Sequence, residues 1–405
     1  MLKGTNLEHA RVHNLRTVLE TVRLHGPLSR ADVAKRSGLT PQTVSNLVSE
    51  LIARGLVREG GQRQGARGRS PTLLSVRPEG AYSIGLDLDR GHLTGLLIDL
   101  SGEVRARVHV ERPFPSPEEA MDLVVSAVDE LSASVEPRRL WGVGIGFPGP
   151  LRISGGAVDN VINPEGFPGW ESVSVRSLLA RRVTPPVFLE NNATAAALGE
   201  AFYGVGAGLS SYFYCFLGVG LGGAIVSSGR PVRGWQGNAG ELGYMPLHEG
   251  GEGDHLGRRF DLFRLYGRLA AKGVRASTYS DLSRLLAAGE PLVLAWLDEA
   301  ADGLARALVS AEYLLDPEAI VVGGAWEEPL VAALVARLEE RLPRLRSPLI
   351  PATASLLTAQ LGADAVARGV ATLPLQELLA PFPTSTDGAA EQRAHPYEHP
   401  LVAVR

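Results

Sequence analysis

The sequence predicts an α/β protein with a small, mainly helical head and a much larger body. Three observations lead to this prediction. Near the N-terminus, two helices separated by a short glycine-containing turn precede an arginine- and glycine-rich loop between two short strands. The body contains two sets of β-rich segments joined by short turns, each set followed by helices. Within the body, the stretch Val187–Glu200 (VFLENNATAAALGE) combines a strand, a polar turn and an alanine-rich helix.

Composition sets the broad class of protein. A chain of 405 residues is long enough for two or three domains and a large core. The single cysteine, Cys215, excludes a disulfide framework and any zinc site with several cysteines. No apolar run approaches the ~18–20 residues that span a bilayer, and the N-terminal residues lack a signal-peptide pattern. We therefore expect a cytoplasmic protein without a membrane partner.

Charge is distributed unevenly along the chain. The net charge is −4, but residues 1–72 hold 12 of the Lys and Arg residues and 5 of the Asp and Glu residues. This gives +7 for the head and −11 for the remainder. A basic head on an acidic body suggests that the head meets a polyanion.

The head carries clear helix boundaries. Arg11–His25 has apolar residues at helical spacing. Ser29 is expected to cap a second helix with Asp32 at its third position, and Thr40 to cap a third helix with Pro41 at its first position. Two helices joined by such a turn form a helix-turn-helix, in which the second helix enters the DNA major groove.

Short polar side chains on these helices suit DNA contacts, because amides pair with adenine and hydroxyls bond phosphates or bases. The loop Gly60–Pro71 resembles the wing of a winged helix, whose arginines reach phosphates or a narrow minor groove. The alternatives are a small helical bundle with a solvated face and a solvated linker, but the charge of the head favours DNA. The expected DNA-binding residues are Ser29, Thr40, Gln42, Thr43, Ser45, Asn46, Ser49, Arg63, Arg67 and Arg69.

The body begins with an expected antiparallel meander of Tyr82–Leu88, His92–Leu100 and Val104–Val110. A helix over Pro115–Ser134 and a buried strand over Leu140–Ile145 follow. The meander pattern then recurs in residues 211–228, around the glycine-rich sequence GVGLGG. A Rossmann turn would need a helix directly after those glycines, so a glycine-rich hairpin of a phosphate-binding type is the better interpretation.

The polar turn is the strongest candidate for a ligand site. Glu190, Asn191 and Asn192 follow a strand, and ligands of open α/β sheets bind beyond the carboxyl ends of strands. Asn192 cannot serve as a general base, because an amide does not titrate near neutral pH. The alternative is a plain helix cap. Trp170 is equally consistent with a sugar platform and with a core residue.

Together these motifs resemble the ROK family (repressors, open reading frames, sugar kinases). The matching stretches are IGLDL, GVGIGFPGP, FPGW, LENNATAAALGE, GVGLGG, GNAGELGY and VVGG. The resemblance implies a two-lobed actin/hexokinase-like (ribonuclease H-like) body, and the head looks like that of the repressor branch. It also implies that Glu190 braces the turn. The sugar-binding residues it implies are Asn163, Asn191, Asn192, Glu241 and Tyr244.

The chain departs from the ROK kinases at several positions. The kinases carry a catalytic Asp where this chain has Asn192, and a Gly-Gly-Thr phosphate turn where it has Asp89-Arg90-Gly91. Their hairpin Thr is replaced by Val219, and the His of their zinc site by Tyr244, with no cysteine in Gly250–Arg258. The resemblance therefore implies a sugar site without catalysis, without a cofactor and without a metal.

The sequence thus predicts a sugar-responsive ROK regulator, a repressor that binds operator DNA and a sugar or sugar-phosphate effector as a homodimer or tetramer. An active sugar kinase with a DNA-binding head, and a DNA binder whose body only dimerises, are the alternatives. The expected domains are a winged helix-turn-helix at 1–78 and a sugar-sensing body at 79–379. Lobe one covers about 79–200 and 362–379, lobe two covers about 201–361, and 380–405 form a disordered tail.

Overall fold

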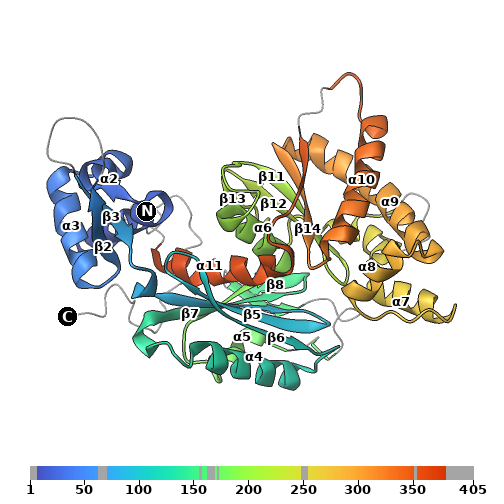
Figure 1. Ribbon diagram of the computed structural model, residues 1–405, viewed down its shortest axis with the longest axis horizontal. Coiled ribbons are helices and arrows are strands. Elements are labelled where there is room, and N and C mark those ends of the chain that lie inside the picture. The colour runs from blue at the N-terminus through green and yellow to red at the C-terminus, as the bar shows by residue number, and fades with distance from the viewer. Residues whose placement is uncertain are drawn as a thin grey trace.

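The computed structural model describes residues 7–62, 71–154, 157–161, 169–170, 173–247, 254–350 and 354–379. Figure 1 shows a small head beside a larger body of two lobes. In these parts of the chain, no helix is both long and apolar enough to cross a membrane. The expected tail, 380–405, lies outside the described residues.

The head is a three-helix unit with a small sheet in the order β1-β3-β2. Both predicted caps are confirmed. Ser29 and Asp32 form a capping box, and the Thr40 hydroxyl accepts a hydrogen bond from the Thr43 amide at 3.3 Å. Gly38 ends the second helix in the left-handed region, at φ 71°, which glycine adopts without steric cost. The elements are α1 (Leu7–His25), β1 (Leu28–Ser29), α2 (Arg30–Ser37), α3 (Pro41–Ala53), β2 (Val57–Gln62) and β3 (Thr72–Val76).

The core of the head continues into the body. The apolar face of α3 is buried against α1 and the sheet, as its helical spacing predicts. The same cluster includes Ile98, Leu100, Trp141 and Leu375 of the body. Head and body therefore share buried apolar surface, in addition to the covalent connection.

Lobe one is built on a sheet in the order β10-β7-β4-β5-β6. The predicted meander is confirmed, since β5 pairs antiparallel with both β4 and β6, while β7 and β10 run parallel to β4. Helices α4 and α5 lie on one side of this sheet and α11 on the other (Figure 1). The elements are η1 (Pro78–Gly80), β4 (Tyr82–Leu88), β5 (His92–Asp99), β6 (Val104–Glu111), α4 (Pro117–Ser132), η2 (Pro137–Arg139), β7 (Leu140–Phe147), β8 (Leu151–Ser154), β9 (Ala157–Val161), α5 (Val175–Ala180), β10 (Val187–Asn191), α6 (Asn192–Tyr203) and α11 (Ala365–Leu379).

Successive side chains of β4 and β7 point to opposite faces of this sheet, and this explains how both faces are covered. Ile84 and Leu86 face the α4 side, while Gly85 and Gly144 lie against α11. A methyl group at Gly85 would come within 1.9 Å of the Ala367 carbonyl oxygen. The glycines therefore let a helix backbone rest directly on the sheet.

Lobe two repeats the same strand order. Its sheet runs β13-β12-β11-β14-β15, so in both lobes the first strand is flanked by the second and the fourth. The predicted glycine-rich hairpin is confirmed by the antiparallel pairing of β11 with β12. Strand β15 was not predicted. The elements are β11 (Tyr212–Leu217), β12 (Leu221–Ser227), β13 (Arg230–Pro231), η3 (Leu242–Tyr244), η4 (Leu256–Arg259), α7 (Leu262–Ala270), α8 (Tyr279–Ala287), α9 (Pro291–Leu315), β14 (Ala319–Gly324), α10 (Glu328–Leu345), β15 (Ser355–Thr358) and η5 (Gly362–Asp364).

Helices α6 and α11 form a layer between the two sheets. They pack backbone to backbone, because a methyl group at Gly369 would come within 1.7 Å of the Ala195 carbonyl oxygen. At the far end of α6, the buried Glu200 carboxylate accepts hydrogen bonds from the amides of Val205, Gln360 and Leu361 at 2.8–2.9 Å. This one carboxylate therefore ties together both chain segments that connect the lobes.

Candidate ligand site and nucleic-acid interface

The polar turn lies where β10 passes into α6. Asn191 is the N-cap of that helix, and its Oδ1 accepts hydrogen bonds from Ala193 N at 2.8 Å and Thr194 N at 3.3 Å. The prediction that this residue caps the helix is therefore confirmed for its side-chain oxygen. Its amide nitrogen points elsewhere, towards Gly149 in the loop after β7.

Gly149 brings two predicted site residues together. A methyl group there would come within 2.2 Å of Asn191 Nδ2 and 2.7 Å of Glu241 Oε1. Because β7 and β10 are parallel neighbours, their carboxyl ends meet at this edge of the sheet, and Glu241 reaches it from lobe two. Burial raises the pKa of Glu241 to about 7. The result is a polar cluster at Gly149 with one amide donor and one carboxyl group.

Asn192 adds an amide oxygen without a partner. The side chain is 3% exposed, and its Oδ1 lies 2.7 Å from where a methyl group at Gly146 would stand. In the described part of the chain this oxygen has no hydrogen-bond partner. Buried polar atoms in folded proteins are normally hydrogen-bonded, so this oxygen is available to a donor group. Being an amide, it can accept a hydroxyl proton in a hydrogen bond but cannot remove it.

Glu190 links the turn to the opposite lobe. Its Oε1 accepts a hydrogen bond from Asn191 N at 3.0 Å, and its Oε2 lies 2.6 Å from Arg233 Nη2. Burial raises the pKa of Glu190, and the charge of Arg233 offsets that rise only in part. These contacts agree with the bracing role that the resemblance implies. A second link joins the lobes where Asn238 exchanges two hydrogen bonds of 2.9 Å with the backbone of Leu151.

The other predicted sugar residues are placed differently. Tyr244 is 46% exposed, ends the short helix that follows Glu241, and stacks on His255 with ring centroids 5.2 Å apart. Asn163 lies outside the described residues. Trp170 is 1% exposed, and its indole donates to the Pro115 carbonyl oxygen at 3.2 Å. The sugar-platform interpretation of Trp170 is therefore wrong, and the core interpretation is correct.

A second polar cluster occupies the end of β4, at the turn where the resemblance implies a phosphate site in the kinases. His92 Nε2 lies 3.4 Å from Asp87 Oδ2. Burial by itself would lower the pKa of His92, but the hydrogen bond to Asp87 and the charge of Asp89 raise it to about 9. Arg90 crosses to lobe two, where a methyl group at Gly220 of the hairpin would come within 3.0 Å of its Nη2. Two carboxylates and an intruding guanidinium make a poor cradle for a nucleotide phosphate.

The described residues contain no group of three or more His, Cys, Asp or Glu side chains that could hold a metal ion. His248 and residues 250–253 of the predicted glycine-rich loop lie outside these residues. Where the chain is described, protein contacts join the segments on either side of that loop. Leu256 N donates to the Met245 carbonyl oxygen at 2.9 Å, and Tyr244 stacks on His255.

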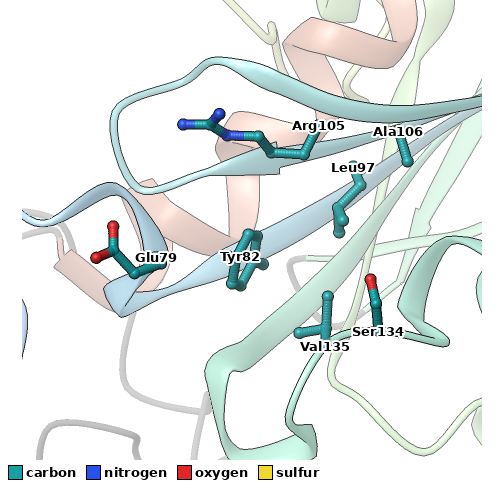
Figure 2. Close-up of a pocket in the computed structure, with 7 residues that line it drawn as sticks. All are labelled: Glu79, Tyr82, Leu97, Arg105, Ala106, Ser134 and Val135. Atoms are coloured by element: carbon teal, nitrogen blue, oxygen red, sulfur yellow. The ribbon is translucent and has the colours of Figure 1, made fainter.

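A separate hollow of about 300 Å³ lies on lobe one near its connection to the head. Its charged groups are already paired, Glu79 with Arg77 at 3.0 Å and Arg105 with Asp99. It offers no free reactive group and lies away from the polar turn. Figure 2 shows the lining residues, which are Glu79, Tyr82, Leu97, Arg105, Ala106, Ser134 and Val135.

In the head, α3 presents most of the predicted DNA contacts on its outer face. Gln42 and Asn46 are exposed and hydrogen-bonded to each other at 3.3 Å, and Ser49 is also exposed. Thr40 lies at the exposed start of the helix, with Thr43 and Ser45 partly covered. The amides at i and i+4 share one face, which is the arrangement a base-reading helix needs.

Ser29 does not belong to this face. It is 6% exposed, and its hydroxyl donates to Asp32 Oδ2 at 2.7 Å inside the capping box. Lys35 and Arg36, which are not among the predicted DNA contacts, are exposed in the last turn of α2. The first helix of a helix-turn-helix crosses the DNA backbone, and that geometry could have identified them. The predicted wing arginines Arg63, Arg67 and Arg69 lie outside the described residues.

Comparisons with known families define the class of protein. A sequence model of the ROK family matches residues 83–377, and a model of the MarR family matches residues 16–68. The first match covers most of the chain, and the protein therefore belongs to the ROK family. The predicted combination of a winged-helix head and a two-lobed ROK body is confirmed.

Individual relatives share this organisation. The xylose repressor of Bacillus spizizenii is 27% identical over 374 residues, which cover 90% of this chain and 96% of the repressor. The crystal structure of a ROK family transcriptional regulator, a homolog of the Escherichia coli MLC protein, covers 91% of this chain and 96% of its own, with a TM-score of 0.73. Its identity is 22%, so this likeness shows the fold. A ROK family glucokinase from Streptomyces griseus, in complex with glucose and AMPPNP, matches 73% of this chain and 100% of its own at 25% identity and a TM-score of 0.63.

Proposed function

We propose that the protein is a sugar-responsive transcriptional repressor. The head binds operator DNA, and a sugar bound between the lobes releases or modulates that binding. The observation that carries this proposal is the pairing, in one chain, of an exposed polar face on α3 with a polar cluster of amide and carboxyl groups between the lobes. The likeness to a xylose repressor along nearly the whole chain supports it.

The DNA-binding role rests on the outer face of α3 and on basic charge. We assign base contacts to Gln42 and Asn46, because side-chain amides can pair bidentately with adenine. Lys35 and Arg36 would contact phosphates. The wing arginines remain part of the proposal on sequence grounds. Since helix-turn-helix proteins bind paired half-sites as dimers, we also propose a palindromic operator and a homodimer or a tetramer.

The sugar-binding role rests on the turn between β10 and α6. Asn191 would donate from its amide nitrogen, Asn192 would accept with its unpartnered oxygen, and Glu241 would hold a hydroxyl from lobe two. Tyr244 remains a candidate contact, and Asn163 remains one on sequence grounds alone. A ligand that touches both lobes favours the closed arrangement by its differential affinity for it.

Helix α6 offers a physical route from this site to the head. It begins at Asn192 and ends at Tyr203, next to the head helix α1. There the Arg23 guanidinium lies 5.6 Å from the centre of the Phe202 ring and pairs with Glu20 at 2.7 Å. The Arg23 side chain is only 4% exposed. We infer that a shift of α6 is transmitted to α1 through this buried contact, and thereby to the spacing of paired heads on DNA.

A gel-shift titration of operator DNA tests the proposal directly. The full-length protein is titrated onto its upstream DNA, alone and with xylose, glucose or N-acetylglucosamine. We expect one sugar to change the operator affinity by about 5–150-fold, the usual range of allosteric coupling. Linkage requires that DNA changes the sugar affinity by the same factor. Unchanged affinity with every sugar would support the alternative of a DNA binder whose body only dimerises.

The glucokinase likeness favours one other candidate, an active sugar kinase with a DNA-binding head. We infer that the chain is not a kinase, because Asn192 cannot take a proton from a sugar hydroxyl and Arg90 intrudes on the phosphate position. A coupled ADP-release assay with the same sugars tests this inference. Turnover of roughly 1–100 per second, as in ordinary kinases, would overturn it.

A further inference from the structure

Two surface helices of opposite charge lie along the lower edge of the body in Figure 1. Helix α4 of lobe one carries five acidic residues and no basic residue, whereas residues 258–275 of lobe two, which include α7, carry six basic residues and one acidic residue. All of the residues that define the two faces are exposed except Arg259, which is half-buried. The acidic face consists of Glu118, Glu119, Asp122, Asp129 and Glu130. The basic face consists of Arg258, Arg259, Arg264, Arg268, Lys272 and Arg275.

Part of the acidic face is neutralised within the chain. Arg182 pairs with Asp122 at 2.7 Å and lies 4.0 Å from Glu118. Arg112 pairs with Glu119. Two arginines beside five acidic residues leave this face with a net charge of −3.

The basic face keeps more of its charge. Asp261 lies 3.9 Å from Arg264, and Glu299 lies 3.6 Å from Arg268. In the described part of the chain these two carboxylates are the only ones in ion pairs with the six basic residues, so the net charge of the face is +4. Arg264 and Arg268 lie one turn apart on the side of α7 opposite to its buried leucines, where a partner can reach both.

An exposed aromatic ring lies where the two faces meet. Phe114 is 47% exposed and lies just before α4 in the chain. The centre of its ring is 4.5 Å from that of Phe263, in the first turn of α7. The N-terminal ends of the two helices are therefore neighbours. The surface consequently has a negative part, a positive part and an apolar side chain between them.

A surface with these three parts is complementary to itself. A rotation by 180° about an axis near Phe114 places the negative part of one copy on the positive part of the other, and each contact then occurs twice. It also brings the two Phe114 side chains to the centre, where aromatic residues contribute most to binding. We propose that a second copy of this chain docks on this edge, with the acidic face of each copy on the basic face of the other. This inference rests on the proposed function, since it assigns a surface to the proposed homodimer.

Other anionic partners fit this surface less well. DNA or an anionic lipid surface attracted to the basic face would also meet the acidic face beside it, and like charges repel. On the outer side of α7, Gly267 and Ala271 lie between the cations, and no large apolar side chain is available there to enter a bilayer. A second copy is the partner for which both parts of the surface are attractive.

Sedimentation equilibrium of the full-length protein tests this docking surface. Wild type should have the mass of two chains, and its dimer should weaken as the salt concentration rises, because salt screens exposed charges. Two variants each reverse two charges on one face, Arg264→Glu/Arg268→Glu on α7 and Asp122→Arg/Asp129→Arg on α4. We expect each variant alone to weaken the dimer roughly 100-fold, because like charges then meet at both contacts.

Mixing the two variants gives the sharpest measurement. The first variant is acidic on both helices and the second is basic on both, so a mixed pair has attraction at both contacts. An equimolar mixture should therefore form dimers with nearly the wild-type affinity, which also shows that both variants are folded. The control Glu328→Arg/Glu339→Arg reverses as many charges on the exposed side of α10 and should remain a dimer.

The aromatic centre is tested by a separate variant. Phe114→Asn removes the ring, and asparagine tolerates the left-handed backbone at this position, where φ is 47°. We expect the dimer to weaken roughly 30-fold, as for other central interface residues. Thermal melting of this variant checks that the lobes remain folded without the contact to Phe263.

The outcomes separate the surface from the homodimer itself. Dimers of unchanged affinity in all three test variants would overturn the docking surface and leave the proposed homodimer intact. Two weakened variants that fail to pair on mixing would refute the contact between the faces. A basic-face variant that stays dimeric but loses affinity for random-sequence DNA would assign that face to DNA and overturn the proposal. A monomeric wild type would count against the homodimer in the proposed function as well.

Discussion

Replacing Glu241 by Gln should stabilise the ligand-free protein in a pH-dependent way. Burial raises the pKa of this carboxyl group from 4.5 to about 7. A raised pKa means that the folded state holds its proton more tightly than the unfolded state does. The proton-linked stability is fully present below pH 4.5 and is lost as the pH rises to about 7. Glutamine has no proton to lose, so the variant avoids this loss.

The size of the effect follows from the pKa. At about 1.4 kcal/mol for each pKa unit, the rise corresponds to roughly 3 kcal/mol, which is an upper value because Glu241 keeps some contact with solvent. We therefore expect Glu241→Gln to be about 1–3 kcal/mol more stable than wild type at pH 8, with the difference shrinking towards pH 4.5.

Urea unfolding curves at several pH values between 4.5 and 8 measure this difference without added sugar. Glu339→Gln, on the exposed face of α10, serves as the matched control and should follow the wild type. Comparison with the control removes the contribution of other titrating groups, such as His92. A difference between Glu241→Gln and wild type that stays constant with pH would refute the claim that this carboxyl is desolvated in the folded protein.

Three further predictions concern the sugar site, the DNA-binding face and the contact between head and body. Gly149→Ala should abolish the sugar response in calorimetry and leave operator binding intact, because its methyl group would displace Asn191 Nδ2 and Glu241 Oε1. Gly267→Ala, in open space on α7, should change neither. Gln42→Ala should weaken the binding free energy for operator DNA by about 1–3 kcal/mol and relax the base preference at the contacted position. Lys35→Ala should weaken binding to DNA of any sequence and reduce the slope of log affinity against log salt concentration by about 1. A variant at Gln42 with unchanged base preference would exclude it from base recognition. Arg23→Ala should still bind sugar and still bind operator DNA, but sugar should no longer change the operator affinity. A full sugar response in this variant would exclude transmission through α6.

Local rules were sufficient to predict the head and most strands. The capping box at Ser29 and the cap at Thr40 depend on residues three positions apart, so the sequence reveals them directly. The meander after Tyr82 was recognisable because its strands alternate with short turns. Within the site, the helix cap at Asn191 follows from the same local chemistry.

Contacts between distant segments were not predictable in this way. The pairing of Glu190 with Arg233 and the approach of Glu241 to Gly149 depend on how the two lobes face each other. The sequence around Trp170 does not distinguish an exposed side chain from a buried one, and only its packing in the folded protein shows that it is buried. Strand β15 is four residues long and pairs with β14 alone in its sheet, so no local pattern distinguishes it from a loop.

The arrangement around Glu200 restricts how the lobes can move. The chain passes between the lobes twice, once after α6 and once before α11, and this single carboxylate holds an amide from each passage. Because both connecting segments bind the same carboxylate, this point can act as a hinge between the lobes. The lobes can swing about that point, but sliding or twisting apart would strip a buried charge of its donors. A closure of the lobes that keeps these hydrogen bonds is therefore expected to be a rotation about this point.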